Sequence, residues 1–290
     1  MSRPYPRIVT SKRLQAGITH VPVQYKPLQN FRYPIDNSIT FERWYMETYL
    51  SSDARDRVYL PVQWTALYCN GKFGEDKNVI RTLQQFLDKL DTTKKYYTIV
   101  QFDDGILNNI DHLDIKVFAM SGPRIDYPLP LLCTPHKFRF DEKRDIFASF
   151  VGRETHPIRT EMIKQLEGKE GYYISTKEHG MKEYCRILAR SKYALCPRGY
   201  GINSFRVQEA IEFGAIPVYI SDKWVWPYNT ENFEYGIILK PEENIHEFLQ
   251  FTDTHMYDTK INHLNTTKHL FTYPGCKKMM LQELAKNESN

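Results

Sequence analysis

Two arginines and a glycine-bearing loop stand close together in the second half of the chain, and their chemistry suits an anion. Arg198 and Arg206 flank the loop that runs from Gly199 to Ser204. A guanidinium group offers a planar fork of donors that can bind two oxygens of one phosphate. Ser204 stands where a helix is predicted to begin, and free backbone N–H groups at such an end attract negative charge. The loop therefore predicts a phosphate-binding site.

The elements that must position this loop are a buried strand before it and a helix after it. The apolar run 193–196 predicts the strand, and proline and glycine in 197–201 end it. Residues 203–213 predict a helix that Gly214 terminates, and 216–220 predict the next buried strand. Glu209 then lies about one turn into the helix.

The same region resembles the signature of the exostosin-like (GT47-type) glycosyltransferases. A second part of the resemblance lies upstream, where 150–153 (FVGR) resembles the beginning of that family's nucleotide-sugar domain. Together the two parts cover roughly residues 145–228, about a third of the chain. The residues that carry the resemblance are Cys196-Pro197-Arg198-Gly199, Ser204, Arg206, Glu209-Ala210, Gly214, Ile216-Pro217-Val218, and upstream Phe150-Val151-Gly152-Arg153, His156 and Arg159.

The resemblance implies a GT-B fold, in which two Rossmann-like domains face each other across a cleft. It also implies transfer of a sugar from a UDP-sugar, such as UDP-xylose, UDP-glucuronic acid or UDP-galactose, to a glycan hydroxyl with inversion. Glu209 would bind the donor ribose. The donor-binding residues would be Arg153, Arg159, Arg198, Gly199, Ser204, Arg206 and Glu209.

Simpler roles remain open for several of these residues. Arg206 could form a surface salt bridge, and Glu209 could be an exposed helix acid. Ser204 could cap the helix without touching a ligand. Gly199 could serve only the turn.

An inverting transfer needs one general base beside the acceptor hydroxyl. Asp103 and Asp104 are our candidates, because they follow the predicted buried strand 96–102 at its carboxyl end, where ligands of parallel sheets bind. A turn-forming role for Asp103-Asp104-Gly105 is the alternative. His112, Asp126 and His156 are further candidates for the base.

No metal or other cofactor is expected beyond the donor substrate itself. The chain contains no Asp-x-Asp motif of the kind that holds a metal-bound diphosphate, and side chains of the adjacent Asp103 and Asp104 would diverge on a strand. Its five cysteines are widely spaced and form no CxxC pair, so free thiols are predicted instead of a zinc site.

Strands alternate with helices in both halves, which predicts the α/β class with parallel sheets. The charged, proline-containing stretch 127–145 separates the halves. We therefore expect an N-terminal acceptor-binding Rossmann-like domain over 1–140 and a C-terminal nucleotide-sugar-binding domain over 141–290. The tail 255–285 predicts two helical pieces around Pro274-Gly275, and we expect the C-terminal helix to pack back on the first domain.

Composition excludes several partners. The net charge of +4 over 290 residues comes without a long basic run, so no nucleic acid is expected. No apolar run approaches 18 residues, so no membrane span is expected. Many relatives of the family are anchored in the Golgi membrane. The chain would therefore be either a soluble cytoplasmic enzyme of bacterial or viral type or a trimmed Golgi-lumenal catalytic domain.

These observations converge on a metal-independent, inverting glycosyltransferase that acts on an oligosaccharide or a glycoprotein glycan. The alternative is a catalytically degenerate, glycan-binding relative that acts as a partner subunit. A dehydrogenase of Rossmann type is disfavoured, because no Gly-x-Gly-x-x-Gly motif follows a first strand.

Overall fold

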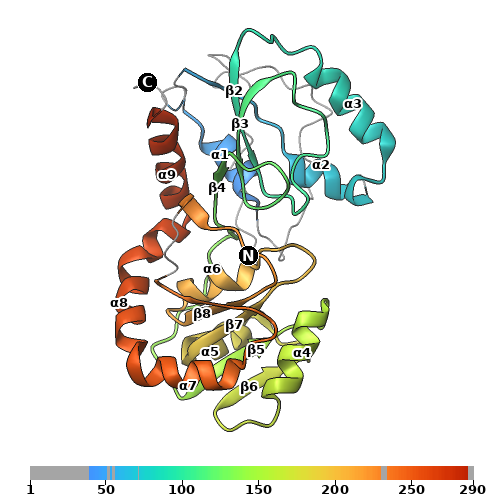
Figure 1. Cartoon of the computed structure of the whole chain (residues 1–290). Helices are drawn as coiled ribbons and strands as arrows, with labels where there is room; N and C mark the ends of the chain where they lie inside the picture. Colours follow the sequence, from blue (N-terminus) through green and yellow to red (C-terminus); the bar gives the residue numbers. More distant parts are fainter. Residues whose placement is uncertain (1–38, 51–52, 54–55, 71, 230–233, 287–290) are drawn as a thin grey trace, which may run out of the picture. The chain divides into compact units, whose positions relative to one another are not determined.

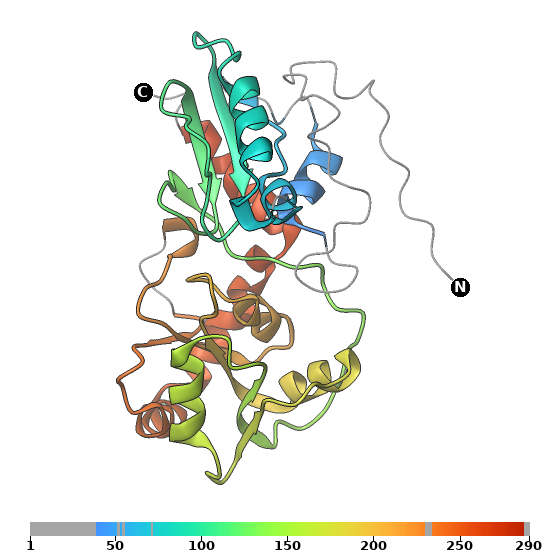
Figure 2. The ribbon, with the colours of Figure 1, turned by 90° about the vertical axis from the view of Figure 1, so that its right-hand side faces the viewer.

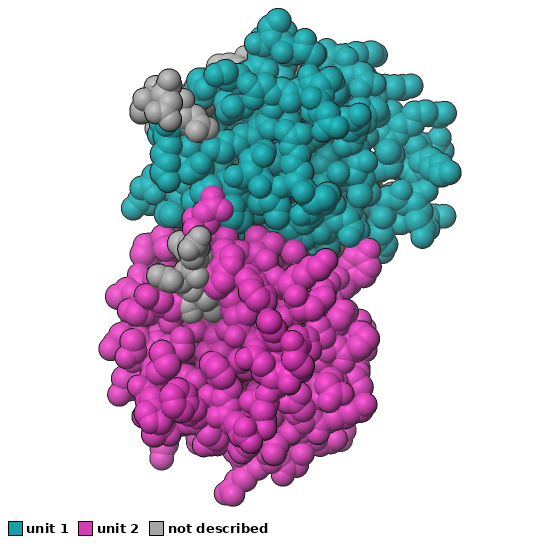
Figure 3. All heavy atoms as spheres, viewed as in Figure 1, with its two compact units in different colours: residues 1–129, 277–290 teal, residues 130–276 magenta. Residues whose placement is uncertain are grey.

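The computed structural model describes residues 39–50, 53, 56–70, 72–229 and 234–286. The chain divides into two compact units, residues 1–129 with 277–290 and residues 130–276 (Figure 3). Each unit has its own sheet, and every strand pair in both sheets is parallel. The predicted first domain starts at residue 1, and its residues 1–38 lie outside the described part.

The first unit is built on a four-stranded sheet in the order β1-β2-β3-β4. Its central strands pair in register from Lys95 with Asp114 to Val100 with Ala119. The strands are β1 (Val58–Tyr59), β2 (Lys95–Val100), β3 (Asp114–Ala119) and β4 (Tyr127–Pro128). The helices are α1 (Phe41–Thr48), α2 (Trp64–Asn70), η3 (Lys72–Gly74), α3 (Lys77–Leu87) and, from Lys277 onward, α9 (Tyr273–Lys286).

Side chains on alternate strand positions give this sheet two different faces. Val100 and Val117 pack in one core cluster with Leu87 of α3. The opposite face presents Lys116, whose ammonium lies 2.8 Å from the Glu283 carboxylate of α9. Helix α3 and residues 277–286 therefore cover opposite faces of the sheet, as Figures 1 and 2 show.

The second unit is a doubly wound, five-stranded sheet in the order β6-β5-β7-β8-β9. The chain runs from β5 to β6 on one side and then returns to β7 on the other, so the strand order reverses between β5 and β7. Ligands of open α/β sheets bind at such a switch point, outside the carboxyl ends of the strands. The strands are β5 (Ile146–Val151), β6 (Tyr172–Ser175), β7 (Ser191–Pro197), β8 (Ile216–Ile220) and β9 (Ile237–Leu239).

Helices cover both faces of this second sheet. Ala194 and Cys196 of β7 pack in one cluster with Cys185 of α5 and Ala210 of α6. Tyr193 points to the opposite face, where its ring contacts Tyr257 of α8. The helices are α4 (Pro157–Leu166), α5 (Met181–Arg190), α6 (Phe205–Glu212), α7 (Ile245–His255) and α8 (Tyr257–Thr267), with short turns η4 (Pro227–Asn229) and η5 (Lys268–Phe271).

The predicted α/β class is confirmed, and two Rossmann-like units with parallel sheets are the make-up of a GT-B chain. The division between the units falls after Leu129, whereas we placed it after residue 140. The intervening residues belong to the second unit because Cys133 and His136 hydrogen-bond to α6. Free thiols are confirmed for all five cysteines.

Candidate donor site and candidate base

A buried arginine joins the two loops at the switch point of the second unit. Arg159 of α4 is 7% exposed. Its Nη1 donates to the carbonyl oxygen of Arg153 at 3.0 Å, and its Nε donates to that of Arg198 at 3.0 Å. The loop after β5 is thereby tied to the loop after β7. Burial, together with the nearby charge of Arg206, lowers the pKa of Arg159 to about 10.

A second arginine lies at the beginning of α6. Arg206 donates through Nε and Nη2 to the carbonyl oxygen of Val151, at 3.3 and 2.9 Å, and lies over the Phe150 ring at 5.3 Å. Within the described part of the chain, neither Arg206 nor Arg159 pairs with a carboxylate; both bond only to backbone oxygens. The salt-bridge alternative for Arg206 therefore finds no partner among the described residues. Two uncompensated positive charges at one edge attract an anion.

Two glycines make room for these guanidinium groups. A Cβ atom on Gly152 would lie 2.2 Å from Nη2 of Arg206, and one on Gly199 would lie 2.9 Å from Nη2 of Arg159. Both contacts are closer than real Cβ atoms allow, so a side chain at either position would displace the arginine. Gly199 therefore does more than form a turn. Gly152 was not predicted as a site residue, although it lies in the FVGR segment.

Ser204 is the N-cap residue of α6, but its hydroxyl makes no capping bond. The residue is 6% exposed, and within the described structure its Oγ has no hydrogen-bond partner. Ser204 is therefore at the cap position that was one of its two expected roles, and its hydroxyl is not used for capping. An unsatisfied buried hydroxyl is costly, so a polar partner from outside the fold would stabilise this end of α6.

Arg198 differs from the other two arginines because a carboxylate neutralises it. Its Nη1 lies 2.5 Å from Oδ1 of Asp222, and this hydrogen bond lowers the pKa of the Asp222 carboxyl. Its Nη2 donates to the carbonyl oxygen of Tyr200 at 3.1 Å. Arg153 is exposed at the same edge and contributes its carbonyl to Arg159. Both remain predicted donor-binding residues.

Glu209 lies inside the second unit. It is 4% exposed, so the alternative of an exposed helix acid is wrong. Its Oε2 accepts a hydrogen bond from the Tyr184 hydroxyl at 2.6 Å, and its Oε1 lies 3.5 Å from Nε2 of His136. Tyr184 and His136 were missed by sequence reasoning, because no local pattern links either residue to α6. A role of Glu209 in binding ribose stays a prediction.

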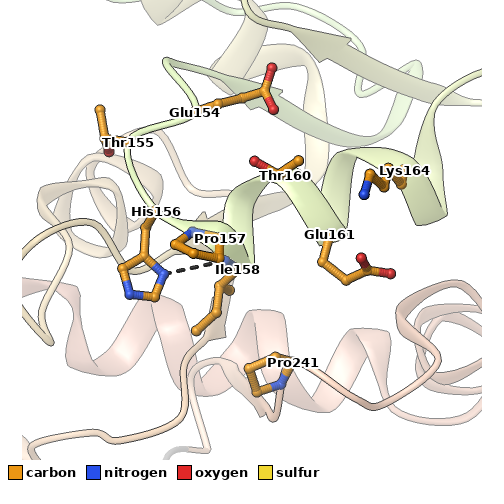
Figure 4. Close-up of a pocket in the computed structure, with 9 residues that line it drawn as sticks. All are labelled: Glu154, Thr155, His156, Pro157, Ile158, Thr160, Glu161, Lys164 and Pro241. Atoms are coloured by element: carbon orange, nitrogen blue, oxygen red, sulfur yellow. Dashed lines mark hydrogen bonds between the residues drawn. The ribbon is translucent and has the colours of Figure 1, made fainter.

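A cavity of about 650 Å³ adjoins α4 (Figure 4). His156 caps the helix here, since its Nδ1 accepts from the backbone N–H of Ile158 at 3.3 Å. Burial and the charge of Arg198 lower the pKa of His156. Glu154 and Glu161 add two carboxylates to the lining, which suits sugar or base hydroxyl and amino groups better than a diphosphate.

Asp103 and Asp104 follow β2 in the first unit, in a tight turn. The N–H of Gly105 donates to the carbonyl oxygen of Phe102 at 3.0 Å. The φ of Gly105 is 72°, a left-handed conformation that favours glycine. A Cβ on Gly122 would lie 2.6 Å from the Cα of Gly105, so the turn packs closely on the loop after β3. Both aspartates are half-buried. The position at the carboxyl end of β2 is as expected, and the role as base stays a prediction.

Two of the other candidate bases are engaged in the fold. Oδ2 of Asp126 accepts from the backbone N–H of Val117 at 2.7 Å, and Nε2 of His112 lies 3.3 Å from the carbonyl oxygen of Leu87. His156 belongs to the second unit, whereas the base was expected from the first.

Sequence reasoning missed a buried acid beside the carboxyl end of β2, the strand that Asp103 and Asp104 follow. Glu42 of α1 is 1% exposed. It accepts hydrogen bonds from the backbone N–H of Gln101 and the hydroxyl of Thr65, both at 2.7 Å. Burial outweighs these bonds and raises the pKa of Glu42 to about 7. The pattern of 41–50 predicts a helix, but gives no sign that its acid lies at the carboxyl end of β2.

Two properties of the described residues bear on metal and membrane. None of their His, Cys, Asp and Glu side chains gather in a group of three or more that could hold a metal ion. None of the helices that the structure describes has the length and apolar character to cross a membrane.

The sequence model of the Exostosin GT47 domain matches residues 108–253, half of the chain. The chain therefore belongs to the exostosin GT47 family. This span contains the loops of the arginine site, α6 and the candidate bases His112, Asp126 and His156, whereas Asp103 and Asp104 precede it.

Curated relatives match over shorter stretches. A probable glucuronosyltransferase of Oryza sativa subsp. japonica is 35% identical over 98 residues, which is 30% of this chain and 22% of that protein. The exostosin-1 homolog of Caenorhabditis elegans is 42% identical over 52 residues, 18% of this chain and 14% of that protein. A probable glucuronoxylan glucuronosyltransferase of Arabidopsis thaliana is 30% identical over 99 residues, which is 30% of this chain and 21% of that protein. The match thus spans about a fifth or less of these relatives.

Two solved structures are similar to this chain at lower sequence identity. The GtfA/B complex has a TM-score of 0.32 at 11% identity, over 82% of this chain and 50% of that chain. The pneumococcal O-GlcNAc transferase GtfA, in complex with UDP and GlcNAc, has a TM-score of 0.38 at 11% identity, over 81% of this chain and 49% of that chain.

Proposed function

We propose that this chain is an inverting glycosyltransferase that moves a sugar from a UDP-sugar to a hydroxyl group of a glycan. One observation carries the proposal. Arg159 and Arg206 bring two positive charges, unpaired with any described carboxylate, to the switch point of the second unit, beside the N-terminus of α6. Such an arrangement is suited to a diphosphate.

The departing diphosphate gains negative charge as the bond to the sugar breaks, so catalysis requires donors aimed at that charge. Arg206, the first N–H groups of α6 and the Ser204 hydroxyl are assigned to this task. Arg159 adds charge and holds both loops in place, with Arg198, Arg153 and Gly199 at the rim. This set requires no divalent metal, so we expect activity to survive excess EDTA. Loss of activity in EDTA that manganese restores would contradict this assignment.

We assign the donor ribose to Glu209. A carboxylate has about four acceptor positions, and Tyr184 and His136 occupy only part of them. The acceptor hydroxyl is assigned to the first unit, with Asp103 or Asp104 removing its proton. Several relatives are named glucuronosyltransferases, which makes UDP-glucuronic acid the first donor to test.

The test is a donor screen with the purified chain. UDP-sugars are scored first by the rise in melting temperature and then, with oligosaccharide acceptors, by release of UDP. We expect UDP itself and at least one UDP-sugar to stabilise the protein, and one donor and acceptor pair to release UDP. Stabilisation by glycans alone, without UDP binding or release, would support a glycan-binding partner subunit and contradict the proposal.

A further inference from the structure

His136 lies between two carboxylates of α6, which belong to Glu209 and Glu212 in the second half of the helix. Nδ1 of His136 lies 2.8 Å from Oε2 of Glu212, and its Nε2 lies 3.5 Å from Oε1 of Glu209. The backbone N–H of His136 donates to the other oxygen of Glu212 at 2.8 Å. The side chains of His136 and Glu209 are each 5% exposed, and that of Glu212 is 10% exposed. Such a buried pair of acids needs a compensating cation.

His136 is the buried group that can provide this charge. Burial alone would lower its pKa, but the hydrogen bonds and charges of Glu209 and Glu212 outweigh burial and raise the pKa to about 9. The other nearby cation, Arg139, has a 64% exposed side chain and reaches only Glu212, at 3.2 Å. Glu209 therefore depends on His136 for compensation at neutral pH.

The charge on Glu209 matters because Arg206 lies three residues earlier on the same helix. Residues three apart are neighbours on a helix surface. Tyr184 is close enough to interact with both charges. Burial has the largest effect on its pKa and raises it; the charge of Glu209 raises the pKa further, and the charge of Arg206 lowers it. Tyr184 and Arg206 also line one small cavity of about 10 Å³. An uncompensated Glu209 would therefore compete with a phosphate for Arg206.

We propose that His136 is a positioning residue for the donor site, whose positive charge neutralises Glu209 and so keeps Arg206 available to the diphosphate. This inference rests on the proposed function, because it concerns the same site. His136 touches no substrate in this scheme; it acts through Glu209 and α6. Other titratable groups that the structure describes near the two acids are Arg139 on the same segment as His136, Tyr184 and Cys185 on α5, and Cys133, whose thiol bonds to Gln208.

The first measurement is calorimetric titration with UDP at pH 7. His136→Gln should raise the Kd about tenfold, the size that one nearby charge produces in a partly buried site. His246→Gln is the matched control, because His246 bonds to the neutral Tyr172 hydroxyl and faces no acid among its described contacts. It should leave the Kd within about twofold. An unchanged Kd in a folded His136→Gln protein would overturn the proposal.

A charge-rescue variant separates electrostatic from steric effects. Inorganic pyrophosphate is the probe, because it has no ribose for Glu209 to bind. His136→Gln combined with Glu209→Gln removes both the cation and the acid that it compensates, so pyrophosphate affinity should return to within about threefold of the wild type. A double variant as weak as His136→Gln alone would show a purely structural role and overturn the inference.

The pH dependence of UDP binding gives a test that needs no change at His136. Affinity should fall as pH rises through about 9, where His136 loses its proton. Glu212→Gln removes one of its partners, so this fall should move about one pH unit lower. Titration of UDP itself cannot produce such a shift. The same midpoint in both proteins would contradict the inference. If the wild type does not bind UDP at all, the proposed function fails and this inference fails with it; normal UDP binding that ignores His136 overturns the inference alone.

Discussion

The two candidate sites occupy equivalent places in their own sheets but are built differently. The arginine site follows β5 and β7 in the second unit, and the Asp103-Asp104 turn follows β2 in the first. Arg159 and Arg206 bond only to backbone oxygens, and the Ser204 hydroxyl has no described partner. The aspartate turn is closed by its own backbone bond and packed against Gly122.

The difference teaches how a ligand site can be told from a well-formed turn. Charges and hydroxyls that the fold leaves uncompensated are costly, so they persist where a ligand compensates them. The arginine site has this property. The aspartate turn has the right place in the sheet and the right side chains, and only a measurement of rate can separate catalysis from turn formation.

The largest effect is expected at the aspartate turn. Asp103→Asn or Asp104→Asn, but not both equally, should lower the rate of transfer by about 10²–10⁴-fold, the usual contribution of a general base. Asparagine keeps the shape of the side chain and can still support the turn. UDP affinity should change by less than about 1 kcal/mol, because the donor site lies in the other unit. Steady-state kinetics and UDP titration of both variants check this.

Two near-wild-type rates would mean that the turn is only structural. The comparison between the sites would then hold for the arginines alone, and His112, Asp126 and His156 would be the next residues to vary.

A smaller but clear effect is expected from a single methyl group in the arginine site. Gly152→Ala places a Cβ only 2.2 Å from the present position of Nη2 of Arg206, so the guanidinium must move. The Kd for UDP should rise at least about tenfold, the loss of one charge-assisted hydrogen bond. Gly180→Ala is the matched control, since nothing lies within 4 Å of its Cβ position and it should bind UDP normally. Equal affinities in both variants would mean that Arg206 does not contact the ligand.

The pH dependence of stability sharpens the account of α6. The folded-state pKa of His136, about 9, lies above its ordinary value of 6.5. Its contribution to the free energy of unfolding is therefore complete below pH 6.5 and is lost as pH rises to about 9. The loss should be on the order of 3 kcal/mol, at about 1.4 kcal/mol for each pH unit of the shift. Urea denaturation between pH 6 and 9.5 measures it, and His136→Gln should remove this part of the dependence. The same pH dependence in both proteins would assign it to other groups.

Local patterns predicted the elements around the arginine site well. The run 193–196 lies within β7 (Ser191–Pro197), and 216–220 is β8 itself. Elements held by distant contacts were predicted less well. The domain boundary is one example: it falls after Leu129 and not after residue 140, because Cys133 and His136 bond to α6. In the tail, the break lies at η5. Pro274 is the second residue of α9, in the first turn of the helix, where a missing N–H costs nothing.

The residues of the candidate sites also differ in whether a local sequence pattern could predict them. Arg159, Arg198, Ser204 and Arg206 belong to motifs with fixed spacing, so the sequence could place them at one edge of a sheet. His136 reaches Glu212 across 76 positions, and Glu42 reaches Gln101 across 59. Such contacts depend on tertiary packing, and neither residue stands in a pattern that would reveal its partner.

The central claim is that Arg206 holds the diphosphate of the donor, and calorimetric titration of UDP into Arg206→Ala tests it most directly. The account predicts that the wild type binds UDP and that the variant, with an unchanged circular dichroism spectrum, loses roughly 1.5–3 kcal/mol of binding free energy, the range for hydrogen bonds to charged groups. Unchanged UDP affinity in a folded Arg206→Ala protein would contradict it.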